Sequence, residues 1–339
     1  MTTDELDKID PESAYEMYLA DREPNVSSST LYAHRSRLGH FVRWCDENEI
    51  ETIAELTGRD LHQYRLWRRD DGDLNRVSEK TQMDTLRVFI RWCEHIGFAA
   101  NDLHLAVQSP SLEAGDNVRD VMLEADRADE VLNYLSKYEY ASLAHVTLLL
   151  LWQCGLRIGA AHALDVDDYD PMELSLEVVH RPATDTPLKN KADGERHVAI
   201  AESTRAVLDD WVGEQRPAVT DGNGREPLLA TVQGRSHKTH LRKLVYAWTR
   251  PCAVSGDCPH GRTIADCDAA GNTKEYSCPS SVPPHAIRRG AITHWLKAEW
   301  PMRAVSGRAN VSQDVLEMHY DQRSEEEKME QRRQFLDTI

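Results

Sequence analysis

Apolar residues recur with the 3.6-residue period of an amphipathic α-helix through the first hundred residues of the chain. The pattern predicts four helices: residues 11–20, a second that follows the hydroxyl-rich run 27–30, residues 58–69, and a fourth that ends at Gly97. Ser78 is predicted to cap the fourth helix, because a serine hydroxyl accepts a backbone N–H from the first turn. Residues 1–105 are therefore expected to form one all-helical domain.

A stretch of low periodicity, residues 106–120, separates this first domain from the rest of the chain. It contains Pro110 and Gly115 among mixed polar residues and is predicted to be a linker. Residues 121–339 are expected to form a second domain with several helices of its own. These helices are predicted at residues 125–137, 140–155, 203–212 and 237–250, from His285 onward, near Met302 and at 324–336. The segment 315–320 has helix signals only as far as Met318.

Two short runs of the second domain have the alternating or β-branched apolar residues that are typical of strands. They span residues 174–180 and 196–200. The segment between them, 187–194, contains two lysines and a glycine and is predicted to be a hairpin connection. The sequence therefore predicts a mainly α fold with a small antiparallel β-sheet.

Length and hydropathy limit where the protein is expected to work. The chain has 339 residues, which is enough for two domains with buried cores. Its longest apolar run, 146–152, is much shorter than the roughly 18 residues of a membrane span. The N-terminus, Met1-Thr2-Thr3-Asp4-Glu5, is acidic and lacks the apolar core of a secretory signal. We expect a cytoplasmic protein with no membrane partner.

The charge balance gives two opposing indications about a nucleic-acid partner. The chain has 57 acidic and 40 basic residues, so its formal net charge is −17, which opposes phosphate binding. Basic residues nevertheless recur on three successive predicted helices of the first domain, which favours a side that faces double-stranded DNA. A halophilic origin would reconcile the two, and the alternative is an acidic protein that never meets nucleic acid. The basic residues are His34, Arg35, Arg37, Arg43, Arg65, Arg68, Arg69, Arg76, Lys80, Arg87 and Arg91.

Two arginines of the second domain, Arg157 and Arg288, each lie at the end of a predicted helix. A guanidinium group matches two oxygens of a phosphate, and two such groups neutralise a phosphoryl transition state without a metal. Tyr320 offers a hydroxyl that becomes a nucleophile when cationic neighbours help it to lose its proton. Taken singly, each residue is more often an ordinary salt-bridge or half-buried residue, so the prediction depends on the whole set.

Proton transfer needs further groups near the same phosphate. His285 precedes Arg288 by three residues, on the first turn of the same predicted helix, where it can bind a phosphate oxygen or accept the tyrosine proton. Lys189 and Lys191 lie in the predicted hairpin connection, where a flexible side chain can protonate a departing 5′-oxygen of DNA.

These residues, in this order, resemble the tyrosine recombinase (phage integrase) family, including its Xer-type and archaeal members. The resemblance covers nearly the whole chain and implies a helical, SAM-like core-binding domain followed by a catalytic domain. It implies a site-specific DNA recombinase or integrase that works as a homo-tetramer, through a 3′-phosphotyrosine intermediate and without a required cofactor. The matching segments are Gly155-Leu156-Arg157-Ile158 with the apolar run before it, Glu195-Arg196-His197-Val198, His285-Ala286-Ile287-Arg288-Arg289 and His319-Tyr320.

The resemblance also assigns roles to individual residues. It implies that Tyr320 attacks the phosphate, that Arg157 and Arg288 hold its non-bridging oxygens, and that His285 assists them. A lysine protonates the leaving oxygen, and the spacing typical of the family favours Lys191 over Lys189.

Two positions depart from the family pattern. Ala160 stands where an acidic residue is usual, and Asp165 or Asp167 is a conceivable replacement. A second His or Trp is usual after a glycine that precedes the tyrosine; here Arg308 follows the glycine and is predicted to be catalytic, with Asn310 as the alternative. These departures leave open a catalytically weak or inactive DNA-binding accessory protein of the same fold. A type IB topoisomerase would share the chemistry.

Four of the seven cysteines lie in one insert, residues 252–278. Four thiolates can form a tetrahedral, structural zinc site, although the insert has no Cys-x2-Cys pair. Unligated thiols are the other interpretation. A zinc-stabilised interaction module without a DNA role is the remaining alternative function. The predicted ligands are Cys252, Cys258, Cys267 and Cys278.

Overall fold

The computed structural model describes residues 6–113, 121–271, 273–321, 323–333 and 336. The chain divides into two compact units, Met1–Val118 and Arg119–Ile339. Each unit has its own hydrophobic core.

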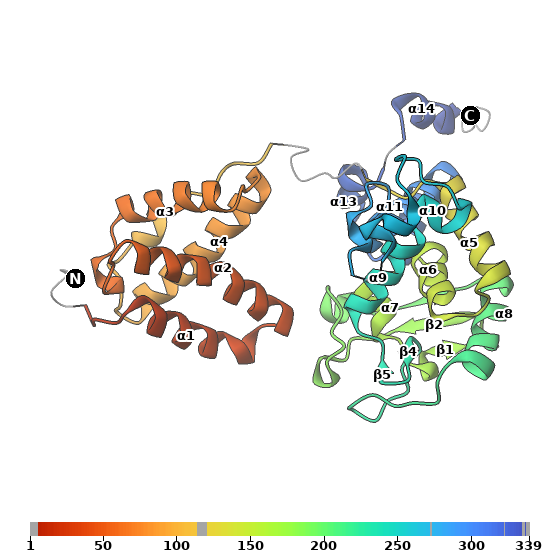
Figure 1. Ribbon diagram of the computed structural model, residues 1–339, viewed down its shortest axis with the longest axis horizontal. Helices are drawn as coiled ribbons and strands as arrows, with labels where there is room; N and C mark the ends of the chain where they lie inside the picture. Colours follow the sequence, from red (N-terminus) through yellow and green to blue (C-terminus); the bar gives the residue numbers. More distant parts are fainter. Residues whose placement is uncertain (1–5, 114–120, 272, 322, 334–335, 337–339) are drawn as a thin grey trace. The chain divides into compact units, whose positions relative to one another are not determined.

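The first unit is a helical bundle with an aromatic core (Figure 1). Phe41 and Tyr64 pack edge to face with ring centres 5.1 Å apart, and Tyr18 and Phe89 do so at 5.3 Å. These rings come from all of its long helices, so their packing stabilises the bundle as a whole. The helices are α1 (Pro11–Arg22), α2 (Ser28–Glu47), α3 (Gly58–Asp71) and α4 (Arg76–His95).

Two predicted helix ends, the N-cap of α2 and the glycine after α4, are confirmed, and one predicted N-cap is wrong. Ser27 caps α2 by accepting the backbone N–H of Thr30 at 3.2 Å, and Gly97, with a φ of +82°, follows the end of α4. The prediction that Ser78 caps α4 is wrong. Asn75 is the cap, and its Oδ1 accepts the N–H of Ser78 at 2.9 Å, because asparagine is at least as good an N-cap as serine.

In the second unit, α6 lies at the centre and packs against α5, α8, α9 and α11 (Figure 1). It begins at Leu143, three residues later than predicted, because Ser142 caps it by accepting the N–H of His145. Among the helices that the structure describes, none has the length and apolar character of a membrane span. The helices of this unit are α5 (Ala125–Tyr138), α6 (Leu143–Gln153), α7 (Ile158–Ala163), α8 (Glu202–Asp210), α9 (Lys238–Trp248), α10 (Pro251–Ser255), α11 (Pro284–Lys297), α12 (Met302–Ala309), α13 (Gln313–His319) and α14 (Glu325–Arg333).

The strands of the second unit are short and antiparallel, which confirms the predicted mainly α fold with a small sheet. Three of them form a sheet in the order β1-β2-β3, in which Leu176 of β2 faces Val198 of β3. The connection from β2 to β3 contains both predicted lysines. The strands are β1 (Tyr169–Asp170), β2 (Ser175–Val178), β3 (Arg196–Ala199), and the separate hairpin β4 (Ala230–Thr231) and β5 (Gly234–Arg235).

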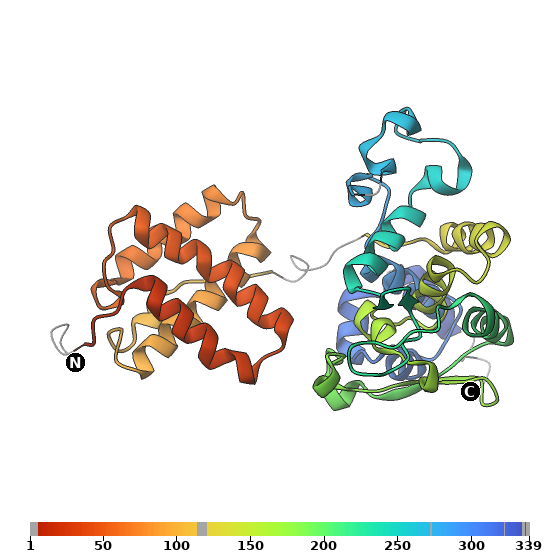
Figure 2. The ribbon, with the colours of Figure 1, turned by 60° about the horizontal axis from the view of Figure 1, so that its bottom comes forward.

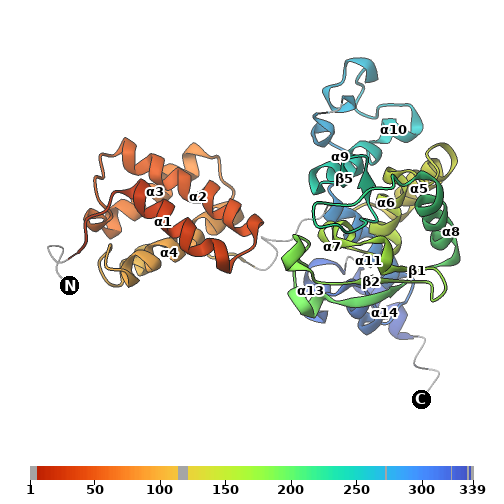
Figure 3. The same ribbon diagram turned by 90° about the horizontal axis from the view of Figure 1, so that it is seen from below.

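The cysteine-bearing segment between α9 and α11 projects as a lobe from the rest of the second unit (Figures 2 and 3). It contains α10 and three short 3-10 turns. The described residues of this segment form no long helix or strand, which agrees with an insert between two core helices.

Candidate active site

Arg288 is the most deeply buried charged residue of the second unit, with no measurable exposure. Its two terminal nitrogens donate to the backbone carbonyls of Gly155 and Ala309. Burial, and after it the nearby charge of Arg157, lower the pKa of Arg288 to about 10. Each terminal nitrogen carries two N–H groups, so the guanidinium keeps donors for another acceptor such as a phosphate.

Arg157 approaches the same place from the N-terminus of α7. Its terminal nitrogens lie 3.3 Å from Oδ1 and 3.1 Å from the backbone carbonyl oxygen of Asn310. Burial lowers the pKa of Arg157, which shows that its charge, like that of Arg288, is partly withdrawn from water. The two guanidinium groups thus lie near each other, and among the described residues no ion pair joins either of them to a carboxylate. This arrangement favours binding of an anion.

Tyr320, directly after α13, is buried beside these arginines and is 4% exposed. Its ring centre lies 5.9 Å from the guanidinium carbon of Arg288. Its hydroxyl lies 3.4 Å from Nε2 of His285, and Thr293 donates to its backbone carbonyl at 2.7 Å. The predicted nucleophile therefore has a histidine close to its hydroxyl and a cation close to its ring.

His285 lies at the start of α11, with part of its side chain open to solvent. The pKa of His285 is lowered to about 4, first because the rest of the ring is packed against protein, and then because Arg288, Arg289 and Arg157 are near. The imidazole is therefore neutral at pH 7, and one ring nitrogen is free of a proton. A neutral imidazole can accept a proton from the adjacent tyrosine hydroxyl.

Both predicted lysines are exposed in the β2–β3 connection. The charge of Lys189 contributes to the lowered pKa of His285, so Lys189 lies within electrostatic reach of that ring. Lys191 begins a 3-10 turn with a φ of +52°, and its backbone N–H donates to the carbonyl of Leu188 at 3.1 Å. The structure therefore places Lys189 near His285. The choice of Lys191 as the proton donor remains a prediction from the spacing typical of the family.

Arg308, predicted to be catalytic, is held by groups of the protein itself. Its terminal nitrogens donate to the carbonyls of Ala199 at 2.8 Å and Gln153 at 2.9 Å. Its guanidinium carbon also lies 5.3 Å from the ring centre of Trp295 and 5.8 Å from that of Trp300. These contacts fit a residue that joins β3, α6 and the end of α11.

Sequence reasoning assigned no role to Arg196, which the structure adds to this cationic region. Its Nε donates to the carbonyl of Arg308 and one terminal nitrogen to that of Gly194, both at 2.8 Å. Burial lowers the pKa of Arg196 to about 10, and Arg157 acts in the same direction. The residue lies in one of the family-like segments, and that segment was the only available signal.

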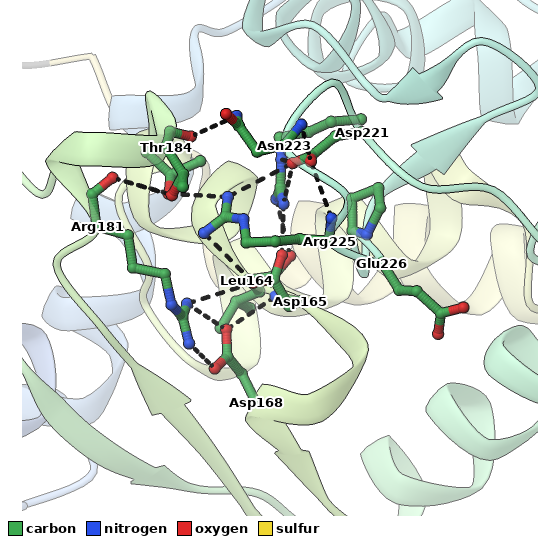
Figure 4. A network of polar contacts seen from close by, with 12 residues as sticks. Leu164, Asp165, Asp168, Arg181, Thr184, Asp221, Asn223, Arg225 and Glu226 are labelled. Carbon is green, nitrogen blue, oxygen red and sulfur yellow. Dashed lines mark hydrogen bonds and ion pairs between the residues drawn. The ribbon is translucent and has the colours of Figure 1, made fainter.

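The acidic residue missing at Ala160 is not replaced by Asp165 or Asp167. Ala160 is buried in α7, whereas Asp167 is exposed. Asp165 belongs to a separate network of aspartates and arginines (Figure 4). Its carboxylate pairs with Arg235, with Arg225 at 3.4 Å and with Arg181 at 3.5 Å.

The same network links four segments of the second unit (Figure 4). Asp168 binds Arg181 with two hydrogen bonds, of 2.9 and 2.5 Å, and Asp221 pairs with Arg235 at 2.8 Å. Burial opposes the charge of Asp221, but its hydrogen bonds, above all from Arg235, hold its pKa below the ordinary value. The network thus anchors the segment that leads from β2 into the lysine-bearing connection.

The four cysteines of the insert carry free thiols. Within the part of the chain that the structure describes, no group of three or more His, Cys, Asp or Glu residues is placed to hold a metal ion. The zinc site stays a prediction from composition.

Comparisons with known proteins concern both units. A model of the phage integrase N-terminal SAM-like domain matches residues 13–97. The tyrosine recombinase XerD of Pseudomonas aeruginosa is 25% identical over 285 residues, which cover 84% of this chain and 83% of that protein. The tyrosine recombinase XerC of Pseudomonas syringae is 23% identical over 314 residues, which cover 91% and 90%.

Two solved structures have a similar fold. The Tn1549 transposon integrase in complex with transposon right end DNA matches with a TM-score of 0.64 and 14% identity, over 98% of this chain and 99% of that one. The lambda integrase bound to DNA matches with a TM-score of 0.60 and 15% identity, over 93% and 96%. At these identities the likeness concerns the fold.

Proposed function

We propose that this chain, which belongs to the tyrosine recombinase and phage integrase family, is a site-specific DNA recombinase that cuts and rejoins DNA through a 3′-phosphotyrosine intermediate. The observation that carries the proposal is the meeting of His285, Arg288 and Tyr320 at one place, with Arg157 close by. A buried tyrosine beside a neutral histidine and two arginines has what an attack on a phosphodiester requires.

In the proposed reaction, the unprotonated nitrogen of His285 accepts the proton of the Tyr320 hydroxyl. The tyrosine oxygen then attacks the scissile phosphorus. Arg157 and Arg288 donate hydrogen bonds to the two non-bridging oxygens, where negative charge increases in the transition state. A phosphotyrosine bond forms on the 3′ side as the bond to the 5′-oxygen breaks.

The departing 5′-oxygen takes a proton from a lysine of the β2–β3 connection, with Lys191 and Lys189 as the two candidates. Religation is the reverse, in which a 5′-hydroxyl attacks the phosphotyrosine and Tyr320 leaves. The bond energy is retained in the covalent intermediate, so the reaction requires no nucleotide. Arg308 is assigned a structural part in this scheme, because its terminal nitrogens already bind carbonyl oxygens.

The proposed partner is double-stranded DNA, although the basic side chains of the first unit are not all available to it. Arg43 pairs with Asp71 and Arg65 with Glu79, each at 2.6 Å, and Lys80 pairs with Asp84 at 2.8 Å. DNA phosphates would compete with these carboxylates for the same cations. We therefore propose binding with a weaker salt dependence than the number of basic residues suggests.

We further propose that the active assembly is a homo-tetramer on two duplexes, with α14 contributing to the contacts between copies. Gln331 of α14 donates to the carbonyl of Leu296 at 2.8 Å and Glu327 pairs with Lys297 at 3.4 Å, but no described side chain of the helix is buried. The exposed remainder of α14 fits a helix that also contacts another copy. Native mass spectrometry of the DNA complex, with and without residues 325–333, tests this assignment.

The test of cleavage uses a library of duplexes that carry a nick near a randomised cleavage position. A nicked strand releases a short fragment after cleavage, so the covalent complex accumulates and is seen on a denaturing gel. We expect an adduct with the wild-type chain and with Tyr276→Phe, an exposed tyrosine of the insert. We expect none with Tyr320→Phe.

The other outcomes are also informative. Sequence-specific binding without an adduct would identify a non-cleaving accessory protein of the same fold. An adduct that persists in Tyr320→Phe would mean that another residue is the nucleophile. Absence of any DNA binding at low and high salt would contradict the proposal as a whole.

A further inference from the structure

We infer that Asn310 is a positioning residue that joins the lysine-bearing β2–β3 connection to Arg157, so that the proton donor and the phosphate-binding group are placed together. The inference rests on the proposed strand-cleavage function. It concerns how Arg157 and the lysine-bearing connection are held at a fixed position relative to each other.

Asn310 directly follows α12 and has a left-handed backbone conformation, with φ 51° and ψ 61°. Among residues with a side chain, asparagine adopts this conformation most readily. Both oxygens of Asn310 accept hydrogen bonds from Arg157, the backbone carbonyl at 3.1 Å and Oδ1 at 3.3 Å. Asn310 therefore helps to orient the Arg157 guanidinium, through its backbone carbonyl as well as its side chain.

The same amide group holds the β2–β3 connection. Its Nδ2 donates to the backbone carbonyl of Asp193 at 2.7 Å, and its Oδ1 accepts from Nδ2 of Asn190 at 2.6 Å. Asn190 lies between the two candidate lysines, and Asp193 follows Lys191 by two residues. One side chain thus holds the connection on both sides of Lys191.

The chemistry of the amide explains why asparagine suits this place. Its oxygen accepts from two donors while its nitrogen donates to a carbonyl, so the group serves an arginine and a loop at once. Aspartate would keep the acceptor but lose the donor to Asp193, and its charge would pair with Arg157. Glycine would keep the left-handed backbone and remove every side-chain bond.

The residue acts through other groups, and this gives the inference a specific kinetic signature. If Asn310 positions the proton donor, its loss should matter most when the leaving group needs a proton. A DNA strand with sulfur in place of the bridging 5′-oxygen leaves as a thiolate, which needs no proton because a thiol is far more acidic than an alcohol.

The experiment measures rates of covalent adduct formation by the full chain on matched oxygen and sulfur substrates of the same sequence. For Asn310→Gly we expect a loss of about tenfold or more on the oxygen substrate and a clearly smaller loss on the sulfur substrate, because the backbone carbonyl at position 310 still binds Arg157. Asn190→Ala should show the same selectivity with a smaller loss. Alanine variants of Lys189 and Lys191 identify the donor, because only its loss is rescued by sulfur.

Equal losses of Asn310→Gly on both substrates would overturn the inference, because they would place its effect on phosphate binding or on folding. Arg157→Ala provides that reference pattern. If Asn310→Gly fails to fold, as judged by its thermal transition, the exposed Asn190→Ala variant decides: an unselective loss or no loss would overturn the inference. No adduct from the wild-type chain on either substrate would contradict the proposed function instead.

Discussion

Nε2 of His285 lies 3.4 Å from the hydroxyl of Tyr320, and the two rings meet edge to face at an angle of 65°. The histidine starts one helix and the tyrosine follows another, 35 positions further along the chain. Thr293, on the helix of His285, fixes the backbone of Tyr320 by a hydrogen bond. The pair is therefore set by the packing of Tyr320, the residue that follows α13, against α11.

The protonation of His285 should respond to DNA. Its pKa is lowered to about 4, first by burial and then by surrounding arginines, so the free protein should keep this ring neutral from pH 5 to 8. A bound phosphate adds negative charge and should raise this pKa. NMR titration of labelled imidazoles, assigned with His285→Gln, should give a midpoint near 4 that rises on addition of DNA. A free-protein midpoint near 6.5 would contradict this.

The substitution Arg308→Lys should affect the stability of the protein more than its rate of DNA cleavage. Loss of one carbonyl contact should lower the free energy of unfolding by about 1–3 kcal/mol, while adduct formation by folded protein falls only a few-fold. Arg157→Lys should show the opposite balance, because a lysine cannot bind two phosphate oxygens in a fork. Denaturant unfolding and single-turnover cleavage provide the two measurements. A stable Arg308→Lys variant with no cleavage would restore the catalytic assignment.

Gly155 should not tolerate alanine. Its φ is +58°, and an added Cβ would lie 2.5 Å from the indole of Trp295. The strained backbone alone is expected to reduce the free energy of unfolding by about 1–3 kcal/mol. Cleavage should also fall, because the Gly155 carbonyl binds Arg288. Gly159→Ala is the control: it lies in α7 with no atom within 4 Å of the new Cβ, so its thermal transition should be unchanged or higher.

The network around Asp165 should be essential for the stability of the second unit. Asp165→Asn leaves Arg235, Arg225 and Arg181 without their shared carboxylate, and we expect a loss of about 3–5 kcal/mol in the free energy of unfolding. Asp167→Asn, two residues away and exposed, should change it by less than about 0.5 kcal/mol. Equal effects of the two variants in denaturant unfolding would show that the network contributes little.

Local sequence patterns predicted the elements well and their boundaries less well. Helical periodicity located the long helices of both units, because a helix that buries one face must repeat its apolar residues every three to four positions. It did not predict the short helices α7 and α10, which contain too few turns to show a period. The start of α4 was misplaced because Asn75 and Ser78 are both good caps, and the sequence does not say which one is used. Residue order alone also singled out His285, Arg288 and Tyr320, which the structure gathers at one place.

The sequence by itself determined the two-part helical architecture, the small antiparallel sheet and the set of residues suited to phosphate chemistry. Only the tertiary structure decided which of these residues meet. Asn310 binds Asn190 across 120 positions, and Arg308 binds the carbonyl of Gln153 across 155. Such contacts depend on how whole helices dock on α6 and on the sheet, and no local period or propensity encodes the identity of a partner so distant in the chain.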